Sequence, residues 1–318
     1  MFGITLDQNI LKPEVVIKDK YDLVIIGAGP GGMNAAIYAA RNGLSTLIVS
    51  KDIGGQLLNT NIIDNYLGFY NISGEALSNH FYEHLNNFKI DKLINHEVLS
   101  LKKENSFFKI KLSNEKIINS KSVILSTGGN PRKLNVPGEL ELTGKGVSYC
   151  VICDGAFYKG RDVIVVGGGN SALEAALDLS KYVNKVHIIQ NLNKFTGDKL
   201  LIDQVINTKN ITYDLNSTIS KIIGDEALKK VEVISNDKIK DINIDGLFIE
   251  IGITPNSKLV KDLVDLNEFN EVVVDNNQQT SLKGLYAIGD VTNNKYKQVI
   301  TAISGGAIAA LEINKNIK

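Results

Sequence analysis

The chain has 318 residues, of which 43% are hydrophobic and 22% are charged, as expected for a globular protein with room for two domains. Its 35 basic residues balance its 35 acidic residues, so no overall field draws it to nucleic acid or to an anionic membrane. No apolar run approaches the roughly 20 residues that span a bilayer. The first 20 residues hold Lys12, Glu14, Lys18 and Asp19 in place of the apolar core of a signal peptide, which predicts a cytoplasmic protein.

An apolar run at residues 21–27 ends in glycine, and alanine-rich residues 33–42 follow at helical spacing, which predicts strand, turn and helix. Gly27, Gly29 and Gly32 form G-x-G-x-x-G at that junction. The first glycine allows a tight turn, the second lets a pyrophosphate approach the backbone, and the third lets helix and strand pack closely. Because both flanks fit, a dinucleotide site is favoured over a βα turn that binds nothing.

Residues 44–50 predict the next strand. Its end carries Ser50 and Lys51 before Asp52, where dinucleotide folds usually place an acid that binds the ribose. The ribose contact is therefore left unassigned. Further strands ending in or near glycine are predicted at residues 122–129, 246–252 and 284–290.

The same pattern returns in the second half of the chain. A strand at residues 162–167 leads through Gly167, Gly169 and Ala172, which form G-x-G-x-x-A, into a helix at 172–181 and a strand at 185–189. The predicted fold class is α/β, with two Rossmann-like, doubly wound, three-layer nucleotide-binding domains, the second inserted in the first. The predicted domains are a first nucleotide-binding domain at 1–130 and 258–318, and a second at 131–257 that carries the cysteines.

The two cysteines, Cys150 and Cys153, form C-x-x-C directly before Asp154. Such a pair at the start of a helical turn favours thiolates and a small reversible disulfide. The alternatives are a zinc site and two buried small side chains. Zinc needs four ligands, and the histidine pair with suitable spacing, His80 and His84, falls in the other predicted domain. No metal site is predicted.

Several strings outside the first glycine motif resemble flavin-domain motifs of the low-molecular-weight thioredoxin reductases. They are GGQL at 54–57, DNYLGF at 64–69, GLYAIGD at 284–290 followed by Val291, and KQV at 297–299. By itself Asp290 would more simply be a turn or helix-cap residue, and the preceding strand favours the flavin role. The resemblance implies that 1–130 and 258–318 form an FAD-binding domain and that 131–257 form an NAD(P)H-like domain. Beyond Gly27, Gly29 and Gly32, the residues that it implies for FAD binding are Gly55, Gln56, Asn65, Gly289, Asp290, Gln298 and Val299.

The resemblance also implies what the cysteine pair does. In that family the pair accepts electrons from the flavin and reduces thioredoxin, and the following aspartate, here Asp154, acts as acid and base with a raised pKa. Rotation of the smaller domain exposes the pair, and the corresponding hinges are residues 130–134 and 252–257. A homodimer is expected on the same basis. Spacing leaves open which cysteine attacks the substrate.

The second glycine motif departs from the family at the donor site. Reductases that use NADPH place arginines after the strand at 185–189 to bind the 2′-phosphate. Here Gln190 ends the strand, Asn191, Leu192 and Thr196 stand at the arginine positions, and Lys194 is the one cation nearby. The sequence therefore favours ferredoxin as the electron donor, as in some related flavoenzymes, with NADH or NADPH as the alternative and a nicotinamide cofactor doubtful.

Two other functions fit parts of the pattern. A flavin ferredoxin–NAD(P) reductase of similar fold would not need Cys150 and Cys153. A flavin-binding redox sensor would use the disulfide to control binding of a partner rather than to turn over. The sequence favours the enzyme that passes electrons through FAD and the cysteine pair to thioredoxin or a similar dithiol protein.

Overall fold

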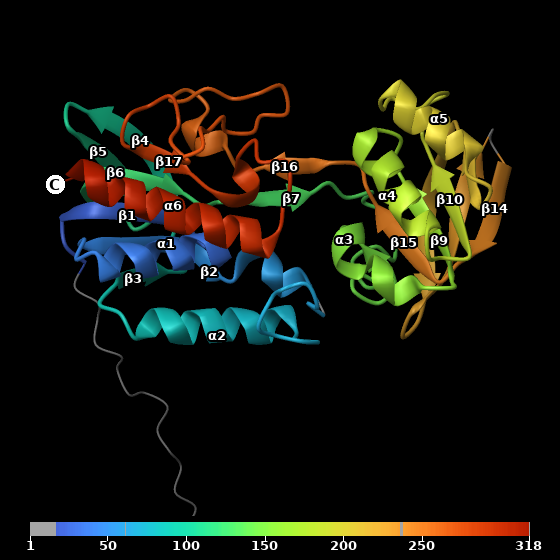
Figure 1. Ribbon diagram of the computed structural model, residues 1–318, viewed down its shortest axis with the longest axis horizontal. Coiled ribbons are helices and arrows are strands. Elements are labelled where there is room, and N and C mark those ends of the chain that lie inside the picture. Colours follow the sequence, from blue (N-terminus) through green and yellow to red (C-terminus); the bar gives the residue numbers. More distant parts are fainter. Residues whose placement is uncertain (1–16, 61, 236–237, 318) are drawn as a thin grey trace, which may run out of the picture. The chain divides into compact units, whose positions relative to one another are not determined.

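The computed structural model describes residues 17–60, 62–235 and 238–317 and forms two compact units (Figure 1). One unit comprises the described residues of 1–55, 79–128 and 256–318, and the other those of 56–78 and 129–255. The sequence predicts domain boundaries at 130/131 and 257/258 and a cofactor for each domain. Which cofactor each domain binds stays a prediction. Most of the segment on which the signal-peptide argument rests lies outside the described residues.

The first unit is built on a sheet with the strand order β3-β2-β1-β6-β5-β4, and β17 pairs with β6. Strands β3, β2, β1 and β6 pair parallel in that order, and β17 pairs parallel with β6. Strand β5 pairs antiparallel with both β6 and β4. The strands span Lys20–Ala28 (β1), Thr46–Ile53 (β2), Asp91–Ile94 (β3), Val98–Glu104 (β4), Phe107–Leu112 (β5), Ile117–Leu125 (β6) and Leu285–Ala287 (β17).

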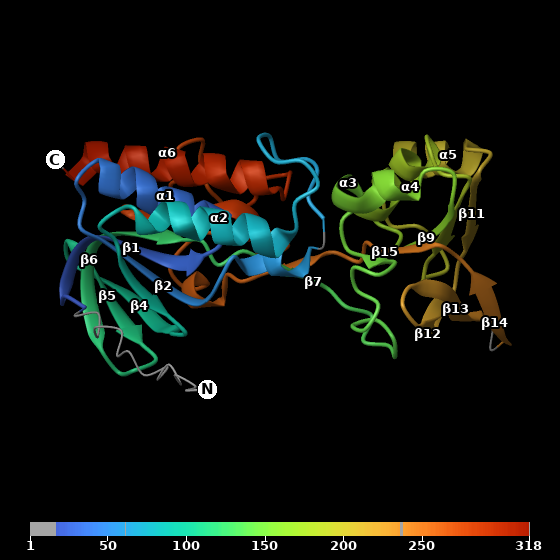
Figure 2. The ribbon, with the colours of Figure 1, turned by 90° about the horizontal axis from the view of Figure 1, so that it is seen from below.

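Helices α1 (Pro30–Arg41) and α6 (Val299–Ile317) lie side by side along one face of this sheet (Figures 1 and 2). Alternation along β1 separates the two faces: Leu23 and Ile25 pack under the helices, while Val24 and Ile26 enter the core on the other face. This is the period of two expected of a strand buried on both sides. The short helices Lys258–Val260 (η3) and Gly289–Val291 (η4) also belong to this unit. The short helix Gly55–Asn59 (η1) and helix α2 (Gly74–Asn86) each include residues that group with the second unit.

The second unit has a parallel sheet with the order β11-β10-β9-β15-β8 and an antiparallel sheet with the order β12-β13-β14. One core joins the parallel sheet to α3, α4 and α5, and another joins it to the antiparallel sheet. The strands span Val147–Ser148 (β8), Asp162–Val166 (β9), Lys185–Ile189 (β10), Ile211–Asp214 (β11), Ser217–Gly224 (β12), Leu228–Ser235 (β13), Lys238–Asn243 (β14) and Gly246–Ile249 (β15). The helices span Val151–Asp154 (α3), Gly155–Tyr158 (η2), Asn170–Ser180 (α4) and Lys199–Asn207 (α5).

The predicted α/β class with two Rossmann-like halves is thus confirmed. Strand β2 differs from its prediction, because it ends at Ile53 instead of Ser50. Its register with β1 shifts so that Ala28 pairs with Ile53. Among the described residues, no helix is long and apolar enough to cross a membrane.

The two segments predicted as hinges form one ribbon. Strands β7 (Gly129–Pro131) and β16 (Ile253–Pro255) pair antiparallel, with Thr254 opposite Asn130. The N–H of Arg132 extends the ribbon by donating to the carbonyl of Gly252 at 2.9 Å. The chain therefore enters and leaves the inserted part of the sequence through paired strands, and rotation about them stays a prediction.

Candidate active site

The first glycine turn has the shape that a bound pyrophosphate requires. Gly27 has φ +109°, and a Cβ there would overlap the carbonyl oxygen of Ser126. A Cβ on Gly32 would overlap the carbonyl oxygen of Gly27. These two glycines therefore serve close packing, whereas a Cβ on Gly29 would meet no atom within 4 Å. Gly29 is the N-cap of α1, so open space lies beside peptide N–H groups, and the turn fits the pyrophosphate of FAD.

The Gly289 turn and the start of α6 lie beside that site within the same unit. A Cβ on Gly289 would come 3.3 Å from the Cβ of Ala302 in the first turns of α6, and the carbonyl of Ala302 also limits Gly31 in α1. Burial raises the pKa of the Asp290 carboxyl, and Lys297 offsets part of that shift. No donor in the described part of the chain hydrogen-bonds this carboxylate, so a ribityl hydroxyl fits there.

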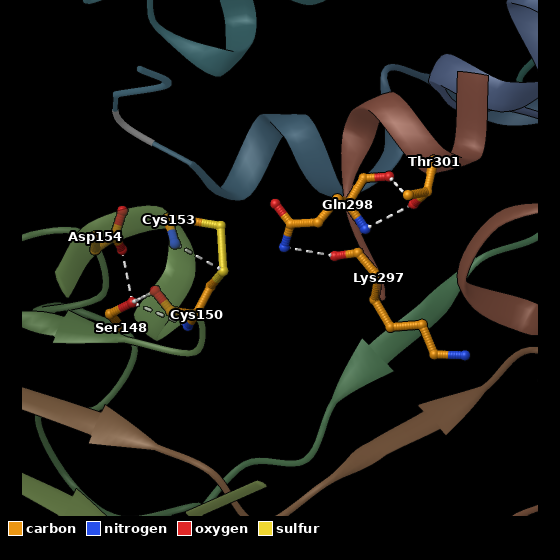
Figure 3. The surroundings of a disulfide bond; sticks show 7 residues. All are labelled: Ser148, Cys150, Cys153, Asp154, Lys297, Gln298 and Thr301. Carbon is orange, nitrogen blue, oxygen red and sulfur yellow. Dashed lines mark hydrogen bonds between the residues drawn. A yellow bond between two sulfur atoms is a disulfide. The ribbon is translucent and has the colours of Figure 1, made fainter. Parts of the chain in front are cut away.

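The start of α6 is organised by Gln298 and Val299, the other two residues predicted there. Thr301 Oγ1 accepts the N–H of Gln298 at 3.2 Å and donates to its carbonyl at 2.8 Å, and Val299 is the first helical residue (Figure 3). The Gln298 side chain donates to the carbonyl of Lys297 at 3.0 Å. Lys297 itself pairs with Glu271 at 2.8 Å, which ties this turn to the unit.

The remaining residues predicted to contact the flavin fall in different units. Gly55 lies beside the first turn, because its Cβ would come 3.6 Å from the Cα of Gly29. Gln56 donates to Oδ1 of Asn130 at 2.9 Å, and both Gln56 and Asn65 belong to the segment 56–78, which groups with the second unit. Their contact with FAD stays a prediction.

No ribose contact was assigned at the end of β2, and the residues there bind other parts of the protein. Ser50 is buried and its hydroxyl accepts the N–H of Ala28 at 3.0 Å. Lys51 pairs with Glu97 at 2.8 Å, and Asp52 accepts the N–H of Gly55 at 3.1 Å. The structure therefore supplies no new candidate at this position.

The cysteine pair stands where the sequence predicts it, at the start of a helical turn. Cys150 and Cys153 form a disulfide with Cα atoms 5.3 Å apart, and Cys150 is the N-cap of α3 (Figure 3). The N–H of Cys153 donates to Sγ of Cys150 at 3.2 Å. An N–H directed at sulfur stabilises a thiolate formed there on reduction.

Asp154 follows the disulfide and is held by a serine that the sequence argument did not include. The Ser148 hydroxyl donates to Oδ2 of Asp154 at 2.6 Å and accepts the N–H of Cys150 at 3.1 Å. Burial raises the pKa of the Asp154 carboxyl, and the bond from Ser148 partly opposes the rise. A carboxyl that keeps its proton more easily than usual can serve as an acid beside sulfur, and this role of Asp154 stays a prediction. Among the described residues, no cluster of three or more histidine, cysteine or acidic residues could hold a metal ion.

The second glycine turn is covered by the loop that follows β10. Gln190 is only 4% exposed, and its side chain fills the space where a Cβ of Gly168 would stand. Its amide donates to the carbonyl of Lys194 at 3.2 Å and accepts the N–H of Asn191 at 3.1 Å. The side chain of Gln190 therefore binds its own loop and is not available to bind a ribose.

Further bonds hold this loop over the turn. The N–H groups of Thr196 and Gly197 donate to the carbonyl of Gly168 at 2.7 and 3.2 Å. Asn170 and Asp198 exchange two hydrogen bonds, of 2.7 and 3.0 Å. The two other residues at the predicted arginine positions, Asn191 and Leu192, are exposed and carry no charge.

Comparison with known proteins identifies the family of this chain. A model of the pyridine nucleotide-disulphide oxidoreductase family matches residues 21–306. The chain belongs to this family. The family uses FAD, so FAD is the cofactor that the first glycine turn fits.

Individual relatives agree with that assignment. A subunit of the alkyl hydroperoxide reductase of Staphylococcus aureus is 38% identical over 296 residues, which is 92% of this chain and 58% of that protein. The chain thus spans under two thirds of the length of this curated relative. The thioredoxin reductase of Streptococcus pyogenes is 35% identical, with a TM-score of 0.89 over 93% of this chain and 97% of that one. The thioredoxin reductase of Lactococcus lactis is 34% identical, with a TM-score of 0.63 over 93% and 99%.

Proposed function

We propose that this oxidoreductase passes electrons from a donor through FAD and the Cys150–Cys153 disulfide to the disulfide of thioredoxin or a similar protein. The observation that carries the proposal is the disulfide itself, which is capped by a peptide N–H and flanked by a carboxyl with a raised pKa. A disulfide that only staples the fold would not need either feature. The family match and the resemblance to thioredoxin reductases support the same reading.

The residues of the chain account for the proton and thiol steps. FAD, when bound, supplies two electrons that break the Sγ–Sγ bond. Asp154 gives a proton to one sulfur, and the N–H of Cys153 stabilises a thiolate on Cys150. A thiolate then attacks the substrate disulfide, a mixed disulfide forms, and the second cysteine resolves it. The substrate leaves with both electrons, and the Cys150–Cys153 bond re-forms.

A protein substrate must reach sulfur atoms that also accept electrons from the flavin. We propose that the second unit rotates about the β7–β16 ribbon, as the hinge prediction requires. The pairing of β7 with β16 at the predicted hinges supports this, because the chain passes through this one ribbon in both directions. We also propose a cytoplasmic homodimer, on the basis of family resemblance.

For the electron donor we propose ferredoxin over NADPH. The positions that would bind a 2′-phosphate carry Asn191, Leu192 and Thr196, and Gln190 is tied to its own loop. Each charge-assisted bond contributes roughly 1.5–3 kcal/mol, so the loss of several lowers NADPH affinity by orders of magnitude. Use of NADH through neutral amide groups is the alternative.

A second candidate substrate follows from the curated relatives. The S. aureus protein is named as a subunit of an alkyl hydroperoxide reductase and is 38% identical to this chain. The dithiol of Cys150 and Cys153 would then reduce the disulfide of a peroxide-reducing partner instead of thioredoxin. The chemistry at sulfur is the same for both, so the substrate protein must be decided by direct assay.

The test is an anaerobic reduction of the FAD-loaded protein by NADPH, NADH or reduced ferredoxin, followed by oxidised thioredoxin or an oxidised peroxide-reducing protein. We expect bleaching of the flavin absorbance by ferredoxin and steady appearance of substrate thiols. Bleaching without transfer to any substrate protein would favour the redox sensor. Saturation by micromolar NADPH would overturn the donor assignment.

A further inference from the structure

A half-buried carboxyl that the steps above do not use lies level with Cys150 in the second unit. Glu250 directly follows β15, the strand that runs parallel to β8. Their register pairs Leu247 with Val147 and Phe248 with Ser148. Continued along the two chains, that register brings Glu250 level with Cys150, and neighbouring strands lie only about 4.8 Å apart.

A hydrogen bond confirms that the two segments meet. The Glu250 carboxylate accepts the peptide N–H of Val151, which belongs to the peptide bond that Cys150 begins. The backbone of Glu250 is fixed as well, because its N–H donates to the carbonyl of Val166 at 2.9 Å and its carbonyl packs against Gly167. The carboxylate is therefore held at the residue whose sulfur is reduced.

We propose that Glu250 is a positioning residue of the redox disulfide, which takes up a proton when Cys150–Cys153 is reduced and so makes reduction depend on pH. The proposal rests on the proposed function, because it needs the disulfide to cycle. It adds to that function a second carboxyl in addition to Asp154, directly after β15 instead of in α3.

The charges around Glu250 favour this role. Burial raises the pKa of the Glu250 carboxyl to about 7, and the bond from Val151 partly opposes the rise. No charged side chain contributes to this shift in the pKa of Glu250. A negative charge that forms nearby would therefore raise that pKa further. The titratable or charged groups on the segments around it are Cys150, Cys153 and Asp154 on and beside α3, and Arg132 beside Gly252. Helix α4 carries no charged residue in its first turn.

Electrons and protons balance over the cycle. Reduction breaks the Sγ–Sγ bond, and two electrons from reduced FAD enter the two sulfur atoms. One proton reaches a sulfur through Asp154 and leaves a thiol. The other sulfur becomes a thiolate, and its negative charge raises the proton affinity of Glu250, which takes a proton from water. When the substrate disulfide is reduced, both protons and both electrons leave with it.

This coupling fixes the sign of the pH dependence. Below about pH 7 Glu250 is already neutral, so replacing it by glutamine changes little. Above that pH an ionised Glu250 opposes the thiolate, and the wild-type disulfide is harder to reduce than that of a Glu250→Gln variant. Glutamine keeps an oxygen that can accept the Val151 N–H, so the variant removes the charge and retains the bond.

The test is a redox titration of the FAD-loaded protein against dithiothreitol at pH 6, 7, 8 and 9, with the cysteines counted by thiol-specific labelling and mass spectrometry. The equilibrium constants for reduction of E250Q and wild type should agree at pH 6 and differ by roughly tenfold at pH 9, as expected for an interaction of about one pK unit. Glu226→Gln, an exposed change of the same charge in the β12–β13 turn, should match wild type throughout.

A ratio of E250Q to wild type that stays constant from pH 6 to 9 would overturn the proposal and leave the proposed function intact. Cysteines that exchange in neither protein would overturn both. If E250Q does not fold, wild type and Asp154→Asn decide: infrared difference spectra of both proteins at pH 8 should gain a protonated carboxyl band on reduction. A band that is absent would contradict a proton on Glu250.

Discussion

The peptide N–H of Cys153 donates a hydrogen bond of 3.2 Å to Sγ of Cys150. A bond from a neutral donor strengthens when the acceptor gains negative charge, so it favours a thiolate on Cys150 over one on Cys153. Spacing alone does not distinguish the two cysteines, and this contact does.

We therefore expect Cys150 to be the more reactive thiol toward iodoacetamide. In the reduced protein at pH 7, Cys150 in a Cys153→Ser variant should react several-fold faster than Cys153 in a Cys150→Ser variant. Serine preserves the backbone donor in each case, so the two variants are matched. Equal rates, or faster alkylation of Cys153, would show that the N–H does not control thiolate formation.

The hydrogen bond from Ser148 to Asp154 predicts a shift in pH dependence. Removing a donor from the ionised carboxylate in Ser148→Ala raises the pKa of Asp154 further. Because the protonated form gives the proton, the alkaline limb of the pH–rate profile for disulfide reduction should move to higher pH. Asp154→Asn should lower the rate by about a hundredfold. An unchanged limb in Ser148→Ala, with the fold intact, would remove Asp154 from the acid role.

Glycines in the two turns give a direct test of the FAD site. Gly29→Ala adds a methyl group that meets no protein atom within 4 Å, so the fold should persist while FAD affinity falls by about tenfold or more. Gly169→Ala is the matched control in the second turn, where the nearest atom is 3.8 Å away, and it should retain FAD. The measurements are thermal unfolding and flavin content after dialysis. Full flavin retention in Gly29→Ala would contradict the pyrophosphate placement.

The donor assignment predicts the effect of added arginines. A triple variant with Asn191→Arg, Leu192→Arg and Thr196→Arg should bind NADPH at least tenfold more tightly than wild type and leave NADH binding unchanged, because only NADPH carries the 2′-phosphate. The bond of 2.7 Å from the backbone N–H of Thr196 to the carbonyl of Gly168 survives the change, whereas the longer bond of 3.3 Å from its hydroxyl is lost. Rates with ferredoxin should fall as ionic strength rises. Wild-type NADPH binding as tight as that of the variant would refute the assignment.

Much of this protein could be predicted from contiguous patterns. The glycine turns, the strand–helix alternation and the C-x-x-C-D string are local, because each role depends on residues a few positions apart. Gly27 and Gly32 proved to be packing glycines and Gly29 an open one, as the motif implies. The predicted end of β2 was wrong, because a shift of its register against β1 extends the strand to Ile53. This shift is a tertiary feature.

The sequence did not predict contacts between residues that only the pairing of strands or the packing of side chains brings together. Glu250 stands a hundred positions from Cys150, and only the parallel pairing of β15 with β8 brings them level. A lone glutamate within the otherwise apolar string GLFIEIG was the available signal. Ser148 was closer, but a serine two residues before a cysteine has no pattern of its own. The folding of Gln190 onto Gly168 likewise depends on side-chain packing.

The most direct test of the account is whether electrons must pass through the cysteine pair. The FAD-loaded wild type and its Cys153→Ser variant are reduced anaerobically with the same donor, and the thiols formed on oxidised thioredoxin and on an oxidised peroxide-reducing protein are counted over time. We predict that the flavin of both proteins bleaches and that only wild type reduces one of these substrates in repeated turnovers. Full substrate reduction by Cys153→Ser would contradict the account.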